Sequence, residues 1–274
     1  MKRILGHVVS LLVCALAVSA AAPACTDNDQ SLFIRNALAP AQNRQNGACL
    51  YTDDPQQAAL FYGDVDLGIR DNYTGVFLVG NQQIPRGDPL AVRAESNRVH
   101  LNGGIVRITR PDGALVREFT ASATGFADPQ NNNAADFGVM GMIVIDAPTA
   151  AILRDNLVAE AARLTSLQPP NTPPVNVRSL SLQVLANIRV IGRSLGGTDI
   201  ESAEYTYPIN VCVGCRVGFP DGVNDTTNAR QPNCLLAPTA TTGASTTAPP
   251  CVAGQDGEGI SCRSCLDKEI CRFF

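Results

Sequence analysis

The sequence predicts a mainly β protein: an antiparallel β-sandwich with one helix and an irregular C-terminal tail rich in disulfides. Apolar residues alternate with polar ones in several runs between residues 59 and 211, as expected for strands that bury one face. Turn residues separate these runs. The regular alternation of strands and helices that would indicate a parallel sheet is missing from the sequence. Cysteines gather from residue 212 onward, where the apolar periodicity ends. Whether the sandwich is immunoglobulin-like stays open, because the chain has no Trp for the Cys–Trp–Cys core of that fold.

The first 24 residues have the composition of a secretory signal. Lys2 and Arg3 precede an apolar run, and small residues then lead to Cys25. The apolar run is shorter than the ~20 residues that a membrane-spanning helix needs. We therefore expect residues 1–24 to be removed and the remainder to be exported.

Cys25 directly follows this signal, in the stretch Ala22-Pro23-Ala24-Cys25-Thr26. The stretch resembles a bacterial lipobox, although Leu is commonest where Ala22 stands. The resemblance implies a diacylglycerol on the sulfur of Cys25, and Thr26 resembles the pattern of outer-membrane lipoproteins. Ordinary signal cleavage at the same bond is the alternative, because Ala22-Pro23-Ala24 also satisfies the A-x-A rule.

Cysteine parity favours lipidation. Cys14 leaves with the signal and nine cysteines remain, so that an oxidising compartment would leave one thiol unpaired. A lipid on Cys25 leaves eight cysteines, which can form four disulfides. We expect Cys49 to reach the tail, and leave the other pairings open. The predicted disulfide cysteines are Cys49, Cys212, Cys215, Cys234, Cys251, Cys262, Cys265 and Cys271.

Residues 25–58 are polar and rich in turn residues, and we expect a tether followed by irregular structure held at Cys49. The sandwich should occupy residues 59–211. Its first strands are expected around three apolar runs and a hairpin. The runs are Val65–Ile69, Phe77–Val79 and Val139–Ile145, and the hairpin joins Ile105–Thr109 to Ala114–Phe119.

The hairpin turn is predicted from Pro111-Asp112-Gly113. Proline presets φ, the aspartate side chain binds its own backbone, and glycine accepts a positive φ. A second hairpin is expected later in the chain. Residues 182–190 alternate, Leu195–Thr198 reverses the chain, and Ala203, Tyr205, Tyr207 and Ile209 would form the apolar face of the returning strand.

One helix is expected near residues 148–167. Asp146 can cap its N-terminus, and Pro148 suits the first turn. An apolar stripe at helical spacing should pack on the sandwich. That stripe consists of Ile152, Leu153, Leu157, Ala161 and Leu164.

The tail, residues 212–274, is too poor in core residues to keep a shape without cross-links, so its cysteines indicate disulfides. The motifs Cys212-x-x-Cys215 and Cys262-x-x-Cys265 also allow a zinc ribbon, but their separation is far longer than usual and export favours oxidation. A redox-active Cys212-x-x-Cys215 would need a helix N-terminus. The motif runs instead into residues 216–220, which are unsuited to starting a helix.

Catalytic and metal-binding residues are weakly indicated. His100 is the one imidazole after the signal, and its place on a strand before a turn favours a surface role. Carboxylate pairs suitable for a glycosidase are Asp64 with Asp66 and Glu201 with Glu204. Calcium could use residues 221–225 or 256–258, but neither matches an EF-hand and turn geometry explains both. We predict no catalytic residue, no metal and no cofactor.

The expected function follows from these features. A formal net charge of −4 argues against nucleic-acid binding. We expect a non-enzymatic lipoprotein, anchored to the bilayer by its acyl chains, with a structural or protein-binding role in the cell envelope, at the outer membrane. The alternative is a secreted soluble hydrolase or ligand-binding domain without lipid.

Overall fold

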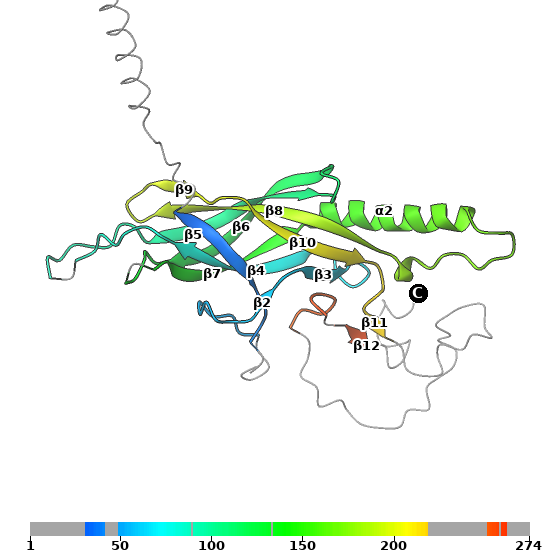
Figure 1. Cartoon of the computed structure of the whole chain (residues 1–274), viewed down its shortest axis with the longest axis horizontal. Helices are drawn as coiled ribbons and strands as arrows, with labels where there is room; N and C mark the ends of the chain where they lie inside the picture. Colours follow the sequence, from blue (N-terminus) through cyan, green and yellow to red (C-terminus); the bar gives the residue numbers. More distant parts are fainter. Residues whose placement is uncertain are drawn as a thin grey trace, which may run out of the picture.

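Two β-sheets face each other across one apolar core, which confirms the predicted β-sandwich (Figure 1). The computed structural model describes residues 31–41, 49–88, 90–132, 134–218, 251–257 and 259–261. One sheet has the strand order β2-β1-β4-β7, and the other has the order β3-β10-β8-β5-β6, with β9 beside β8. Neighbouring strands are antiparallel except β3 with β10, and β11 with β12 in a separate two-stranded sheet.

The elements have these bounds. The first sheet contains β1 (Leu32–Leu38), β2 (Ala59–Leu60), β4 (Tyr73–Asn81) and β7 (Asp136–Ile145). The second contains β3 (Gly63–Asp66), β5 (Val99–Thr109), β6 (Leu115–Ala127), β8 (Ser181–Ser194), β9 (Asp199–Glu201) and β10 (Tyr205–Cys212). The remaining elements are α2 (Ala147–Ser166), the 3₁₀-helix η3 (Val177–Ser179), β11 (Val217–Gly218) and β12 (Ile260–Ser261).

The core lies between the inner faces of the two sheets. Phe77 of β4 is fully buried, and its ring meets the ring of Tyr207 of β10 edge-on at 6.0 Å between centroids. Inward residues at every second position of β8 complete the layer, because successive side chains of a strand point to opposite faces. These residues are Val184, Ala186, Ile188 and Val190, as the sequence predicts.

The prediction of irregular structure throughout residues 25–58 is wrong for β1. Residues 32–38 form a strand between β2 and β4, and Leu32 is fully buried. The register shifts between Ile34 and Asn36, and such a bulge places an extra residue in the strand. The bulge breaks the period of two, and that broken pattern made the strand look irregular.

The predicted strand Val65–Ile69 ends early, at Asp66. The Asp66 side chain accepts a hydrogen bond from the Gly68 N–H (2.8 Å), and its carbonyl accepts from the N–H groups of Ile69 and Arg70 (3.0 Å each). These bonds turn the chain away from the sheet, as expected when an aspartate binds backbone two residues ahead.

The helix prediction is confirmed, with one change in its buried face. Asp146 is the N-cap and accepts from the Thr149 N–H at 3.0 Å. Leu153, Leu157 and Ala161 are buried, but Ile152 is exposed. The helix buries Thr149 and Ala150 instead, because they precede Leu153 by four and three residues and so lie on the same face.

Both predicted hairpins form. In the first, the Gly113 N–H binds the Arg110 carbonyl (2.9 Å), Gly113 has φ +86°, and Asp112 accepts from the Ala114 N–H (3.0 Å). In the second, β8 pairs with β9 and β10, but residues 202–204 interrupt the returning strand. Ala203 is therefore exposed rather than part of an apolar face.

The described part of the tail packs onto the sandwich. Gln255 forms an isolated antiparallel β-bridge with Val65, and the Asp66 N–H donates to the Gly254 carbonyl at 2.8 Å. These residues therefore cover the outer edge of β3, which is the edge strand of its sheet. Covering an edge removes a place where another strand could add.

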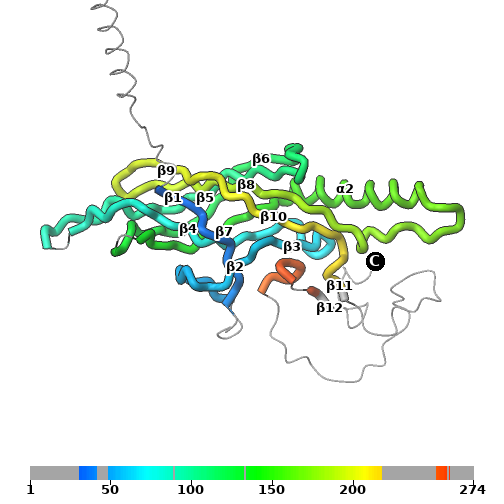
Figure 2. Tube along the Cα trace, in the orientation of Figure 1, coloured from blue at the N-terminus to red at the C-terminus, as the bar shows by residue number. Residues whose placement is uncertain are grey.

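The sandwich has two distinct ends (Figure 2). At the loop end lie Ser31 and the loops 82–98, 128–135 and 195–198. At the helix end lie the 110–113 turn, the start of α2 and the CxxC motif after β10. Of the helices that the structure describes, none combines the length and hydropathy of a membrane span.

Candidate functional site

Two disulfides connect four of the predicted cysteines. Cys49 is joined to Cys251 across 202 residues of sequence, so it reaches the tail as expected. Cys212 is joined to Cys215 at the end of β10. The other predicted cysteines lie outside the described residues, as does the predicted signal; they are Cys25, Cys234, Cys262, Cys265 and Cys271.

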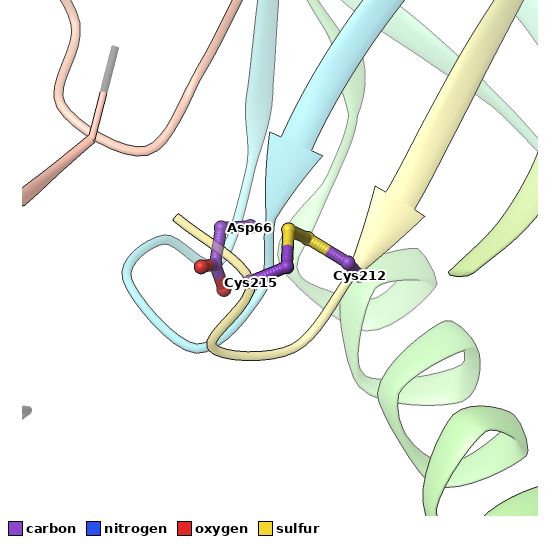
Figure 3. Close-up of side chains that lie close together, drawn as sticks. All are labelled: Asp66, Cys212 and Cys215. Carbon is purple, nitrogen blue, oxygen red and sulfur yellow. A yellow bond between two sulfur atoms is a disulfide. The ribbon is translucent and has the colours of Figure 1, made fainter. Parts of the chain in front are cut away.

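Asp66 lies beside the Cys212–Cys215 disulfide (Figure 3). Its side chain is fully buried at the end of β3. One carboxylate oxygen accepts from the N–H groups of Gly214 (2.6 Å) and Gly68, and the other accepts from the Arg216 N–H (2.7 Å). Three backbone donors stabilise a buried carboxylate, so Asp66 fixes both its own turn and the CxxC loop.

The chemistry of this site depends on the state of the sulfurs. A carboxylate oxygen of Asp66 and the two Sγ atoms lie within 4.8 Å of one another. Thiolates at this spacing could hold a metal ion with Asp66, but a disulfide sulfur carries no thiolate charge. Cys215 is followed by a turn and β11 rather than by a helix, so the thiolate lacks the helix dipole that activates redox motifs. The arrangement favours a structural cross-link.

A polar groove of about 410 Å³ opens next to the disulfide. Asp64 and Arg178 line it together with Cys215, and Asp64 forms an ion pair with Arg216. The Arg178 guanidinium donates to the carbonyls of Gly214 (3.0 Å) and Val217 (2.8 Å). Burial lowers the pKa of Arg178, and the Asp66 charge opposes that shift. The charges of the groove are thus committed to holding the loop.

A second buried cluster joins the tail to the core. The Tyr73 hydroxyl donates to Asp256 at 3.0 Å and lies 3.1 Å from the Tyr207 hydroxyl. The Gln255 amide donates to Asp256 (2.9 Å) and to the Thr74 carbonyl (2.7 Å). Burial raises the pKa of Tyr73 well above its usual value, and also raises the pKa of Asp256. A raised tyrosine pKa keeps the hydroxyl protonated, and the hydrogen bonds of this cluster clamp the described tail residues onto the sandwich.

The other candidate residues do not come together. His100 lies on β5, and its ring packs against the Phe126 ring in a tilted arrangement with 4.9 Å between centroids. Glu204 pairs with Arg107 (3.4 Å), and Glu201 pairs with Arg189. The carboxylate pairs suggested for a glycosidase are therefore each engaged by a cation or by backbone N–H groups. Residues 221–225 and Glu258 of the suggested calcium loops lie outside the described residues.

Sequence reasoning missed the association of Asp66 with the CxxC loop and the clamp around Asp256. The first depends on β3 pairing in parallel with β10, where the paired Gly63 and Ile209 lie 146 residues apart. The second depends on Gln255 forming a β-bridge with Val65 at the outer edge of β3. The local signal for Asp66 was the Asp66-Leu67-Gly68 turn, in which an aspartate precedes a glycine by two residues. No local pattern indicates the tyrosines that meet Asp256.

Comparisons with protein-family models, with curated proteins and with solved structures find no match to this chain. The function is therefore inferred from the chain's own residues.

Proposed function

We propose that this protein is an exported lipoprotein, anchored by acyl chains on Cys25, with a structural or protein-binding role in the cell envelope and no enzymatic activity. The observation that supports it best is the Cys49–Cys251 disulfide, together with Cys212–Cys215. Disulfides persist in oxidising compartments outside the cytosol. In such a compartment nine cysteines cannot all form disulfides, and lipidation of Cys25 would account for the unpaired one.

The engagement of the acidic groups supports a non-enzymatic role. Asp64, Glu201 and Glu204 each pair with an arginine, and Asp66 is saturated by backbone donors. A general acid or base must be free to exchange a proton with a substrate. Within the described residues these carboxylates instead hold loops and strands in place.

The geometry also favours a defined orientation at a membrane. The first described residue, Ser31, follows Cys25 by six residues, and six extended residues span at most ~20 Å. An anchor on Cys25 would keep the loop end of the sandwich near the bilayer. The helix end, with its groove and the described tail residues, would then face away and be available to a protein partner.

The test is the intact mass of the chain purified from the envelope of the producing cell. We expect a mass above that of the 25–274 polypeptide by a diacylglycerol and a further acyl chain. Replacing Cys25 with Ala should release the chain into the soluble fraction, whereas Cys49→Ser, the matched control, should leave the lipid in place. A bare polypeptide mass would contradict the proposal and favour a secreted protein.

A further inference from the structure

The loop between β4 and β5 exposes three aliphatic side chains at the loop end. Leu90 is 96% exposed, Val92 is 91% exposed and Ile84 is 68% exposed. Single exposed apolar residues are ordinary, but Leu90 and Val92 lie two residues apart in the far part of this loop, and Ile84 is exposed nearer its base. We name the pair Leu90 and Val92 the apolar tip.

The base of this loop is held by a single carboxylate. Glu95 accepts hydrogen bonds from the N–H groups of Arg86 (2.9 Å), Gly87 (2.7 Å) and Asn97 (2.6 Å). The Asn97 amide in turn donates to the Ile84 carbonyl at 2.8 Å. The two sides of the loop are thereby fastened to each other.

The far part of the loop is held in the same way. Asp88 and Arg93 exchange two backbone hydrogen bonds of 2.9 Å, and the Asp88 carboxylate accepts from the N–H groups of Leu90 (2.9 Å) and Ala91 (3.1 Å). Val92 has φ +52°, a conformation that β-branched residues rarely adopt. Such a conformation persists where surrounding contacts enforce it, so the apolar tip is presented in a fixed shape.

The loop leaves the sandwich beside the point where the chain enters it. The Gln82 N–H donates to the Ser31 carbonyl at 2.7 Å, and Leu32 pairs with Asn81. A tether from Cys25 to Ser31 therefore ends at the base of the loop, within about 20 Å of the anchored residue. This placement indicates which surface the apolar tip meets.

The charges around the apolar tip suit a phospholipid surface. Arg86 and Arg93 are exposed on the loop, whereas the carboxylates of Asp88 and Glu95 are turned onto backbone N–H groups. The two carboxylates stay ionised, so these four charges balance. The arginines can still contact lipid phosphates, beside aliphatic side chains that suit the boundary between acyl chains and headgroups.

We propose that the apolar tip inserts into the outer part of the same bilayer that holds the acyl anchor, so that the sandwich contacts the membrane at two points. The inference rests on the proposed lipid anchor at Cys25. Because the anchor keeps the loop at a high local concentration near the lipid, a small apolar contact suffices to orient the domain.

The chain has no Trp, so a Leu90→Trp substitution introduces a unique fluorescent reporter. The mature chain carries a hexahistidine in place of Cys25 and is attached to phosphatidylglycerol and phosphatidylethanolamine vesicles that contain a nickel-chelating lipid. This attachment reproduces the tether whether or not Cys25 is naturally lipidated, and the intact mass tests the anchor separately. The matched control is Leu115→Trp, at the helix end, where Leu115 is 62% exposed.

With lipids brominated near the headgroup, the Leu90→Trp chain should lose about half or more of its emission, because interfacial insertion is ~5–10 Å deep. The Leu115→Trp chain should lose none. Adding Val92→Asp and Ile84→Asp to Leu90→Trp should restore the emission. An equal loss of emission for the Leu90→Trp and Leu115→Trp chains would overturn the proposal. So would photo-crosslinking from position 90 to an envelope protein rather than to lipid.

Discussion

Replacing Asp66 tests whether one buried carboxylate holds the end of the sandwich together. The side chain is fully buried and accepts hydrogen bonds from the N–H groups of Gly68, Gly214 and Arg216. Each donor left without a partner in the interior costs about 1–3 kcal/mol. Removing the carboxylate also removes the cost of burying its charge, which offsets part of this loss. We therefore expect Asp66→Ala to lower the free energy of unfolding by about 3–5 kcal/mol. That loss is about a fifth or more of the roughly 5–15 kcal/mol typical of a domain.

Two further variants make this measurement specific. Asp66→Asn keeps the oxygen that serves Gly68 and Gly214 but loses the acceptor for Arg216, so the expected loss is about 1–3 kcal/mol. Asp64→Asn, on the same strand, removes the partly exposed ion pair with Arg216 and should cost about 1 kcal/mol or less. Urea unfolding followed by far-UV circular dichroism, with the disulfides intact, gives all three values. If Asp66→Ala lost no more than Asp64→Asn, the role assigned to Asp66 would be refuted.

Three other perturbations address the tail and the helix. Replacing Cys49 and Cys251 together with Ser should lower hydrogen-exchange protection at residues 254–256 more than in β8, since loop entropy gives ~5 kcal/mol as an upper value for a 202-residue separation; unchanged protection there would contradict a role of the disulfide in holding these residues. Asp146→Ala should lower the free energy of unfolding by about 1 kcal/mol, measured by urea unfolding, whereas Asp146→Asn should retain most of the cap. Burial raises the pKa of Asp256, so its ionised form costs stability, and the docking of residues 254–257 should strengthen as the pH falls toward that raised pKa and weaken as the pH rises through it. Exchange protection factors, corrected for intrinsic rates, should therefore increase as the pH is lowered from neutrality within the range in which the sandwich stays folded, and Asp256→Asn should abolish this increase.

Elements defined by local chemistry could be predicted from the sequence. The helix follows from its cap at Asp146, and the first hairpin follows from Pro111-Asp112-Gly113. In both cases the signal lies within a few residues of the element that it specifies. The strand β1 could not be predicted in this way, because its bulge at Ile34–Asn36 removes the alternation on which a strand prediction depends.

The candidate site was predicted less well, because long-range pairing creates it. The sequence places Asp66 on a strand and Cys215 at the start of the tail, and nothing local states that the two meet. The parallel pairing of β3 with β10 brings Asp66 opposite Cys212. A separate bridge between Val65 and Gln255 places Asp256, suggested as a calcium ligand, within hydrogen-bond distance of the Tyr73 hydroxyl. The chemistry of these carboxylates was therefore decided by neighbours more than 140 residues away.

The link between Cys49 and Cys251 has a consequence for biogenesis. Cys49 leaves the ribosome first, and its partner follows 202 residues later, on the order of 10–40 s at ~5–20 residues/s. In the last part of that interval the Cys49 thiol could oxidise with Cys212 or Cys215, which emerge before Cys251. The free edge of β3 likewise awaits Gln255 and cannot be shielded until translation is almost complete. On the proposed export, we expect a disulfide isomerase to correct premature cross-links, and cells that lack one should accumulate chains with scrambled disulfides.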